Sequence, residues 1–456
     1  MPIASGSAHA EGVNRLLRSY RAIPTTATVR LAKPTSNLFR ARAKSTTPGL
    51  DTSGLTGVID VDPVNRTAEV AGMCTYEDLV AATLAHGLSP LVVPQLKTIT
   101  LGGAVTGLGI ESASFRNGLP HESVLEMDIL TGSGEIVTAA PDRLADLYRG
   151  FPNSYGTLGY SVRLRIQLEP VKPFVALRHI RFHSLDELVS VMESIVNTAA
   201  YEGESVDYLD GVVFAADECY LSLGALTAAP GPVSDYTGQR VYYRSIQHPD
   251  GISNDRLTIH DYLWRWDTDW FWCSRAFGAQ NPGIRRLWPR KYRRSSVYWK
   301  LIALDQRYDI ADRIERFNGR PARERVVQDV EVPISRTPEF LRWFLDEIPI
   351  EPVWVCPLRL RDSEGWPLYP IRPGQTYVNI GFWSSVPAGA VEGATNRLIE
   401  RKVSELGGHK SLYSESFYTR DEFEPLYGGE HYRTLKKTYD PDNRLLDLYA
   451  KAVRRQ

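Results

Sequence analysis

The sequence predicts an α+β protein of two domains, and three observations favour this fold class. The chain has 456 residues, which is more than one hydrophobic core usually supports. Its N-terminal part mixes short β-prone runs with a helical segment. Its C-terminal part follows the order strand, helix, strand, strand, helix, strand.

Strand signals in the N-terminal part come in pairs that turn residues separate. Residues 57–72 hold two β-prone runs around Asp62-Pro63 and Asn65, which favour a hairpin turn. Residues 123–139 have the pattern of a strand, a Gly-Ser-Gly turn and a second strand, and residues 156–170 end in a run with β alternation. We expect these strands to form a mixed α+β region.

One helix is expected between these strands. Thr75 and Asp78 resemble a capping box at its start. Val80, Leu84 and Leu88 share one apolar helical face, and Gly87 sits where a helix commonly ends.

The C-terminal half has the clearest order of elements. Its predicted strands lie at 326–332, 352–360, 376–383 and 411–418, and its predicted helices at 338–348 and 393–406. Ile399, Val403 and Leu406 give the second helix an apolar face, and Gly407 ends it. This order matches a ferredoxin-like βαββαβ unit, whose sheet can form one wall of a ligand cavity.

Charge and composition exclude several classes of protein. The formal net charge is −1, whereas a nucleic-acid-binding domain is strongly basic. The four cysteines lie far apart without a C-x-x-C pair, so we expect a reducing compartment and neither a disulfide framework nor a zinc site. His179 and His183 alternate on a predicted strand without further ligands, so we expect an exposed structural pair and no metal.

No segment has the pattern of a signal peptide or a membrane span. The opening of the chain contains no apolar h-region. The most apolar later stretch, 79–94, is interrupted by His86, Gly87, Ser89 and Pro90. We therefore expect a soluble or peripheral protein in the cytoplasm.

A glycine-rich segment carries the first sign of a ligand site. Residues 100–112, TLGGAVTGLGIES, hold four glycines in thirteen positions. Because glycine has no Cβ, such a backbone can turn tightly or lie against a flat, charged ligand. The segment is not a Rossmann turn, since no apolar helical period follows, and not a P-loop, since no G-K-[ST] follows. Taken alone, it is open to both interpretations, packing and ligand binding.

Four segments carry a resemblance that favours ligand binding. KPTSNLF (33–39), PQLKTITLGGAVTGLGIES (94–112), SVLEMDILTGSGEIV (123–137) and PNSYGTLGYSVRLRIQLEP (152–170) follow one another as in the FAD-binding domain of vanillyl-alcohol-oxidase-type (PCMH-type) flavoproteins. Within that superfamily the chain most resembles the Δ24-sterol reductase branch, and the likeness continues through VVQDVEVP, YVNIGFW and LYSESFYTRDEFEPLYGGEHYRTLKKTYD.

The resemblance implies a domain division and a set of cofactor residues. It implies an FAD-binding domain over 1–172, a substrate (cap) domain over 173–412 and a C-terminal segment, 413–456, that returns to the flavin. No histidine lies in 33–40 or 95–117, where many relatives attach FAD, so we expect noncovalent FAD. The residues expected to contact FAD are Thr35, Ser36, Asn37, Thr100, Gly102, Gly103, Thr106, Gly107, Gly109, Ile110, Glu111, Ser112, Gly156, Thr157 and Gly159.

The resemblance also implies a reaction, the reduction of a carbon–carbon double bond in an apolar lipid with NADPH as the electron donor. An isolated double bond is not polarised, so hydride delivery needs a proton donor, for which Glu415, Tyr418 and Lys436 are candidates in the C-terminal segment. A sterol-like side chain or a methylene-branched fatty acyl chain presents such a bond. The same fold hosts aldonolactone and alditol oxidases, and a flavin-stabilised partner subunit without turnover is a third interpretation.

The middle of the chain carries an aromatic and basic insertion at about 255–300. Residues 261–275 and 284–300 hold six of the ten tryptophans, and the second stretch has seven Lys and Arg residues and no acid. This composition suits the headgroup region of an anionic membrane at its inner face. It equally fits a packed aromatic cap with a solvated basic face, or a site for the phosphates of NADPH.

Overall fold

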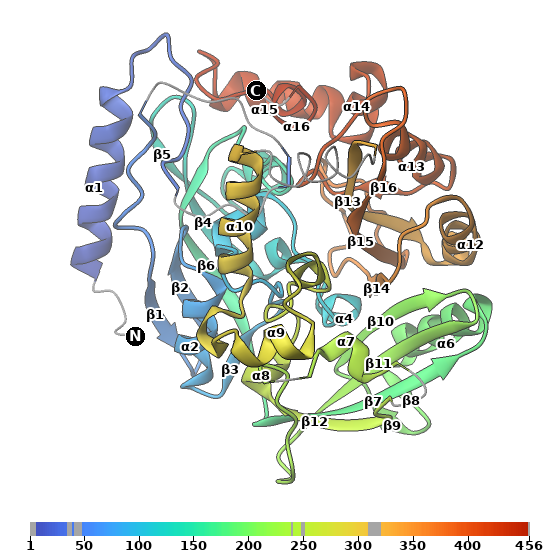
Figure 1. Ribbon diagram of the computed structural model, residues 1–456. Helices are drawn as coiled ribbons and strands as arrows, with labels where there is room; N and C mark the ends of the chain where they lie inside the picture. The colour runs from blue at the N-terminus through green and yellow to red at the C-terminus, as the bar shows by residue number, and fades with distance from the viewer. Residues whose placement is uncertain are drawn as a thin grey trace.

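The computed structural model describes residues 6–33, 39–40, 48–238, 240–247, 251–308 and 321–454, which form mixed helices and antiparallel sheets (Figure 1). The predicted α+β class is confirmed. Two large sheets organise the described residues, and the strands of the first all precede those of the second in the chain. Helix α1 (Gly6–Ala22) packs Leu16 and Tyr20 against the first sheet.

The first sheet has the strand order β1-β2-β6-β4-β5, with β3 paired to β6, and all pairs are antiparallel. The predicted hairpin is confirmed, because Asp62 Oδ1 accepts hydrogen bonds from the amides of Val64 (2.9 Å) and Asn65 (3.0 Å). The strands are β1 (Val58–Asp62), β2 (Thr67–Ala71), β3 (Leu88–Pro90), β4 (Val124–Leu130), β5 (Ile136–Ala139) and β6 (Tyr160–Pro170).

Helix α2 (Tyr76–Leu84) starts at the predicted cap but ends earlier than predicted. Thr75 Oγ1 accepts a hydrogen bond from the amide of Asp78 (3.2 Å) and donates one to its carboxylate (2.8 Å). Gly87 has φ +69° and turns the chain into β3, so Leu88 belongs to a strand and not to the helical face. The glycine segment contains a helix that the sequence did not predict, α3 (Leu101–Thr106).

The second sheet joins two units of the same topology. Its order is β12-β7-β11-β10-β14-β15-β13-β16, and β10 pairs with β14 at the junction. Counted outward from the junction, each half has its strands in the order second, third, first, fourth, which is the ferredoxin-like order. The half formed by β13 to β16 was predicted, and the other half was not. The strands are β7 (Phe174–Phe182), β10 (Tyr208–Ala215), β11 (Glu218–Thr227), β12 (Asn254–Thr258), β13 (Arg323–Pro333), β14 (Val353–Leu358), β15 (Tyr377–Pro387) and β16 (His409–Lys410), and a separate pair is β8 (Ala200–Tyr201) with β9 (Glu204–Ser205).

Helices α6 (Leu185–Thr198), α12 (Thr337–Glu347) and α13 (Ala394–Glu405) cover one face of the second sheet (Figure 1). Side chains alternate along a strand, so Val330 and Ile380 pack against these helices. Asp329, Asn379 and Trp383 lie on the opposite face, toward the first sheet. This inner face forms one wall of the site described below.

The prediction of a last strand over 411–418 is wrong. β16 contains only His409–Lys410, and beyond it the Ser411 amide makes one further bond to the carbonyl of Asp329 (3.0 Å). The carboxylate of Glu400 on α13 then accepts hydrogen bonds from Lys410 Nζ (2.8 Å) and the Phe417 amide (3.1 Å). These bonds draw the chain off the sheet edge toward the helix.

The prediction that His179 and His183 form an exposed pair is also wrong. His179 is buried on β7, where its Nδ1 shares a hydrogen bond with Ser222 Oγ (2.8 Å), whereas His183 is exposed. Among the residues that the structure describes, no three His, Cys, Asp or Glu side chains gather as metal ligands would. In the same residues, no helix has the length and apolar character to cross a bilayer.

Short helices complete the fold. The C-terminal helices α14 to α16 pack back onto the first part of the chain, where Lys436 Nζ donates a hydrogen bond to the carbonyl of Thr157 (2.9 Å). The remaining helices are α4 (Ser114–Asn117), α5 (Ala145–Gly150), α7 (Tyr242–Ser245), α8 (Ile259–Leu263), α9 (Pro282–Leu287), α10 (Ser295–Tyr308), α14 (Arg420–Leu426), α15 (Gly429–Tyr439) and α16 (Leu448–Ala452), with 3-10 turns η1 (Pro120–Ser123), η2 (Cys273–Phe277), η3 (Arg290–Tyr292) and η4 (Ile334–Arg336).

Candidate functional site

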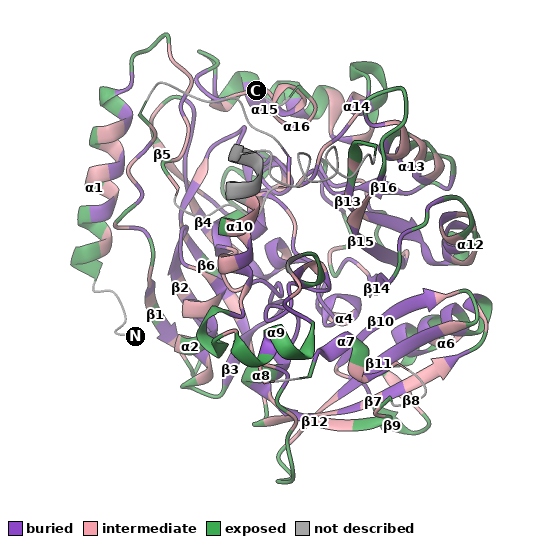
Figure 2. Ribbon diagram, viewed as in Figure 1, coloured by how far each residue is buried: buried purple, intermediate pink, exposed green. Residues whose placement is uncertain are grey.

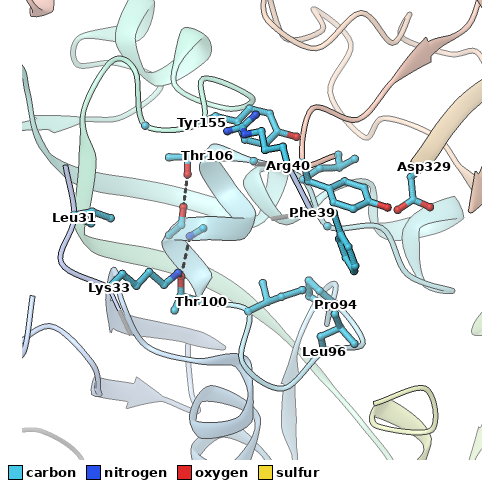
Figure 3. A pocket seen from close by; sticks show the side chains of 18 of the residues that line it. Leu31, Lys33, Phe39, Arg40, Pro94, Leu96, Thr100, Thr106, Tyr155 and Asp329 are labelled. Carbon is cyan, nitrogen blue, oxygen red and sulfur yellow. Dashed lines mark hydrogen bonds between the residues drawn. The ribbon is translucent and has the colours of Figure 1, made fainter. Parts of the chain in front are cut away.

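A cavity of about 480 Å³ lies between the two sheets, within the range typical of small-molecule sites. Residues 94–110 and 155–161 form its floor, and the inner face of the second sheet with residues 270–273 forms the opposite wall. Figure 3 shows Lys33 on one side of the cavity and Asp329 on the other, with Thr100, the N-cap of α3, and Thr106, the last residue of α3, between them.

Two of the predicted glycines serve packing. A Cβ on Gly102 would lie 2.2 Å from Ser161 Oγ and 2.5 Å from the carbonyl oxygen of Gly72. A Cβ on Gly109 would meet the rings of Pro94 and Pro120 at 2.7 and 2.9 Å. Only glycine allows these close approaches, which hold the segment against the first sheet.

Gly103 and Gly107 line the floor of the cavity, where Gly103 leaves it open and Gly107 also lies close to a backbone carbonyl. Among the described residues, a Cβ on Gly103 would meet only Thr100 Oγ1 (2.9 Å) and Lys33 Nζ (3.7 Å). A Cβ on Gly107 would meet the Gly103 carbonyl oxygen at 2.9 Å and the edge of the Tyr155 ring at 3.4 Å. A planar ligand can therefore lie directly against this backbone.

The structure brings most of the predicted cofactor residues to this cavity. Those that line it are Thr100, Gly102, Gly103, Thr106, Gly107, Gly109, Ile110 and Gly156. The predicted pyrophosphate residues Thr35, Ser36 and Asn37 lie outside the described residues. Four predicted residues do not line the cavity: Glu111, Ser112, Thr157 and Gly159.

Glu111 and Ser112 bind protein groups behind the cavity wall. Glu111 Oε1 accepts a hydrogen bond from Gln95 Nε2 (2.9 Å) and lies 3.1 Å from Arg265 Nη2. Burial raises the pKa of Glu111, and the charge of Arg265 opposes this shift. Ser112 Oγ shares a hydrogen bond with Tyr262 Oη (2.8 Å).

Thr157 and Gly159 support the loop that ends at the cavity. Thr157 Oγ1 donates a hydrogen bond to the carbonyl of Ser154 (2.7 Å). Gly159 has φ +148°, and a Cβ there would meet Ile129 Cγ2 at 2.6 Å. Both residues lie outside the cavity lining and support the backbone of Gly156, which lines it.

Four cations line the cavity beside the glycine floor: Arg30, Lys33, Arg40 and Lys451. Lys33 Nζ donates to Thr100 Oγ1 (3.0 Å), and Lys451 Nζ to the carbonyl of Tyr155 (2.6 Å). Sequence reasoning missed all four as site residues, although two of them flank the predicted pyrophosphate loop. Their positive charge suits a diphosphate.

The residues present fit FAD. An open glycine floor accepts a flat ring system, and the cations match the charge of its diphosphate. Ser161 Oγ is buried at the cavity and has no hydrogen-bond partner among the residues that the structure describes, so it offers a group to a ligand.

The opposite end of the cavity is aromatic. Phe271 stacks on Trp383 with ring centroids 4.3 Å apart, and Trp354 and Trp270 line the same end. Asp329 lies among these rings, where burial raises the pKa of its carboxyl to about 6. Sequence reasoning identified this strand but missed Asp329, because only the fold places it beside the glycine segment.

The predicted proton donors Glu415, Tyr418 and Lys436 all lie outside the cavity lining. Lys436 Nζ is bound by Asp440 (2.5 Å) and by the carbonyls of Thr157 and Leu445 (2.9 Å each). Tyr418 is buried against other aromatic rings, and the carbonyl of Glu415 accepts a hydrogen bond from Lys410. In this structure these contacts hold the C-terminal segment in place.

The aromatic and basic insertion divides between the interior and the surface. Its tryptophans 264, 266, 270 and 272 are buried. A second hollow of about 310 Å³ is lined by Lys97, Arg290, Lys291, Arg293 and Arg294, among others. Arg293 is buried, and its guanidinium donates hydrogen bonds to the carbonyls of Thr237 and Trp288 (2.7 Å each). Arg294 forms an ion pair with Glu77 (2.6 Å).

Comparisons with known proteins agree with this geometry. Residues 25–140 match the family model of an FAD binding domain. Together with the two-sheet fold and the glycine-floored cavity, this match defines an FAD-dependent oxidoreductase with a PCMH-type FAD-binding domain. The FAD cofactor expected from the sequence is confirmed.

Most of the chain is similar to Delta(24)-sterol reductases, so the resemblance seen in the sequence is confirmed. The identity to the Rattus norvegicus protein is 25% over 415 residues, covering 87% of this chain and 76% of the relative. The identity to the Arabidopsis thaliana protein is 24% over 451 residues, covering 88% and 76%. Cytokinin dehydrogenase 6 of Oryza sativa subsp. japonica is 32% identical over 145 residues, covering 32% of this chain and 27% of its own.

Proposed function

We propose that this protein uses FAD to saturate an isolated carbon–carbon double bond in an apolar lipid, with NADPH as the electron donor. The observation that carries the proposal is the aromatic end of the cavity, which adjoins the glycine floor. A polyol or sugar would find few polar partners there, which favours the reductase over an aldonolactone or alditol oxidase. The names of the sterol reductase relatives support the same reaction type.

The chain's own residues have defined tasks in this reaction. FAD, when bound, supplies the hydride chemistry. The cations Lys33, Arg40 and Lys451 hold its diphosphate, and Thr35, Ser36 and Asn37 add hydroxyl and amide donors. The rings of Trp270 and its neighbours enclose the alkene and exclude water. A sterol-like side chain or a methylene-branched fatty acyl chain fits this apolar end.

We also propose a division of the chain into an FAD-binding domain (1–172), a substrate domain (173–412) and a returning segment (413–456), with noncovalent FAD. The first sheet ends at Pro170 and the second begins at Phe174, which supports the first boundary.

A surface patch supports peripheral binding of a cytoplasmic protein to an anionic membrane. We define the α9 patch as Ile284, Leu287 and Tyr292 with Arg286, Arg290 and Lys291. The first three are large apolar side chains that are 45%, 85% and 47% exposed. Figure 2 shows α9 as an exposed segment. Exposed apolar groups beside cations suit a headgroup interface, where a lipid substrate resides.

Anaerobic mixing tests the proposed reaction. NADPH should bleach the visible flavin band of the purified protein, and a Δ24-unsaturated sterol or a methylene-branched C18 fatty acid should restore it with formation of the saturated product. Bleaching by polyols or aldonolactones, with peroxide formed in air, would instead establish the oxidase. A flavin that responds to none of these compounds would contradict turnover and favour a partner subunit.

A further inference from the structure

Asp329 is the one carboxylate among the described residues that line the cavity. It lies on β13, and Figure 3 shows it on the side of the cavity away from Lys33. The neighbouring strand leaves room for it, because a Cβ on Gly381 would lie 2.4 Å from Asp329 Oδ1. The sheet therefore positions one acid at the place where an alkene would lie against the flavin site.

Hydrogen bonds orient this acid. Asn379 Nδ2 donates to Asp329 Oδ1 (3.1 Å), and the Tyr413 hydroxyl donates to the same carboxyl group. Trp383 Nε1 in turn donates to Tyr413 Oη (3.0 Å), which leaves the Tyr413 proton directed at Asp329. The carboxyl is thus held in one orientation between two strands and the segment after β16.

The surroundings of Asp329 keep its protonated form available near neutral pH. Burial raises its pKa to about 6, while the hydrogen bonds from Asn379 and Tyr413 oppose this shift. The other titratable groups near it are Glu331, two residues along the strand, the Cys356 thiol, and the hydroxyls of Tyr155 and Tyr369. Burial raises the pKa of each of these groups as well, so the tyrosine hydroxyls are neutral at the pH where Asp329 titrates, and the pKa of Glu331 is shifted in the same direction as that of Asp329.

We propose that the Asp329 carboxyl donates the proton that completes saturation of the double bond, an inference that rests on the reaction proposed above. The Asp329 O–H bond breaks and its electron pair stays on the carboxylate. The proton forms a C–H bond at one alkene carbon with the π electrons, while a hydride from the reduced cofactor, with its electron pair, bonds to the other carbon. Water returns the proton to Asp329 after the product leaves. Tyr413 is a positioning residue for this acid.

The first test compares two isosteric variants of neighbouring acids. Asp329→Asn should keep its FAD and be bleached by NADPH at the wild-type rate, but reoxidation by the alkene should slow at least ~100-fold, as for loss of a general acid. The matched control is Glu331→Gln, which lies on the same strand face outside the cavity lining and should reoxidise at the wild-type rate. Equal reoxidation by wild type and Asp329→Asn would overturn the role of Asp329 and leave the reductase standing. A wild type that ignores the alkene would overturn both.

A second test needs no turnover. Infrared difference spectra of the oxidised protein, recorded through pH 5–8, should show a protonated carboxyl band that titrates near pH 6. The band should be present in Glu331→Gln and absent in Asp329→Asn. A titrating band that survives in Asp329→Asn would overturn the assignment.

The pH dependence provides a third test that keeps Asp329 intact. A general acid acts below its pKa, so the alkene step should be fast at low pH and slow as pH rises through about 6. Tyr413→Phe removes a hydrogen bond that stabilises the carboxylate, so it should raise the pKa of Asp329 and move the falling limb to higher pH. A limb that stays in place, or moves to lower pH, would overturn the proposal even if Asp329→Asn fails to fold.

Discussion

The adjacent glycines Gly102 and Gly103 of α3 face different neighbours, so the same substitution should have different effects at each. Gly103→Val would place a branched side chain on the open floor, and we expect a folded protein that binds FAD at least ~100-fold more weakly. Gly102→Val would press against the backbone of Gly72, and we expect a loss of stability of ~3 kcal/mol or more. Flavin absorbance and thermal melts measure both effects, and stoichiometric FAD in folded Gly103→Val would contradict the flavin assignment.

Single residues of the site differ in how far the sequence reveals them. The glycines could be predicted, because dense glycine has few explanations apart from close backbone approach. Arg40 and Lys451 could not, since a lone cation in a sequence is most often a solvated one. Asp329 was hidden inside a strand that reads as β-prone, and its chemistry depends on burial that only the fold creates.

At the scale of elements, the α9 patch should govern attachment to membranes. Replacing Arg286, Arg290 and Lys291 by Gln removes three charges of ~1 kcal/mol each, so binding to anionic vesicles should weaken by about 150-fold. Arg293 is excluded from this set because protein carbonyls bind its guanidinium. Co-sedimentation with anionic liposomes measures the effect.

The control set removes three exposed arginines on other helices: Arg336, Arg342 and Arg433. This control should sediment like wild type. If the α9-patch variant sediments unchanged but needs far more NADPH to reduce its flavin, the patch recognises the NADPH phosphates and the membrane proposal is wrong.

Elements with strong local signals were predicted well, and elements set by distant contacts were not. The hairpin at Asp62 and the cap at Thr75 depend on side chains that bond their own neighbours, so the sequence contains the whole cause. The segment 411–418 has β alternation, but Glu400 on a helix binds its amide and draws it from the sheet. The domain boundaries stay a prediction.

At the scale of the whole molecule, a buried ion cluster joins the flavin segment to the second sheet. Arg265 is fully buried and lies 3.1 Å from Glu111 and 2.8 Å from Asp210. Arg265→Ala would leave two buried carboxyl groups without a cation, so we expect the free energy of unfolding to fall by ~3–5 kcal/mol. Denaturant titration measures this change.

A surface pair provides the comparison for that variant. Arg178→Ala removes an exposed partner of Glu202 and should change stability by less than ~1 kcal/mol. Equal losses in the two variants would show that the buried cluster does not hold the parts together.

The duplicated topology of the second sheet was beyond prediction, because two units can share a strand order without sharing a sequence period. The predicted half had helices and strands of ordinary length. In the other half, the short β8–β9 pair and the four-residue helix α7 interrupt the pattern before β12 is reached.

The cavity is assembled from both extremes of the chain, and this fixes the order of events during synthesis. Phe39 donates its amide to the carbonyl of Tyr413 (2.9 Å), Arg40 Nη1 binds the carbonyl of Leu412 (2.5 Å), and Lys451 lines the same space. When the glycine segment has been synthesised, the aromatic wall of the cavity and its last cation, Lys451, have not yet been made. The cofactor therefore meets a complete pocket only after residue 451 has emerged.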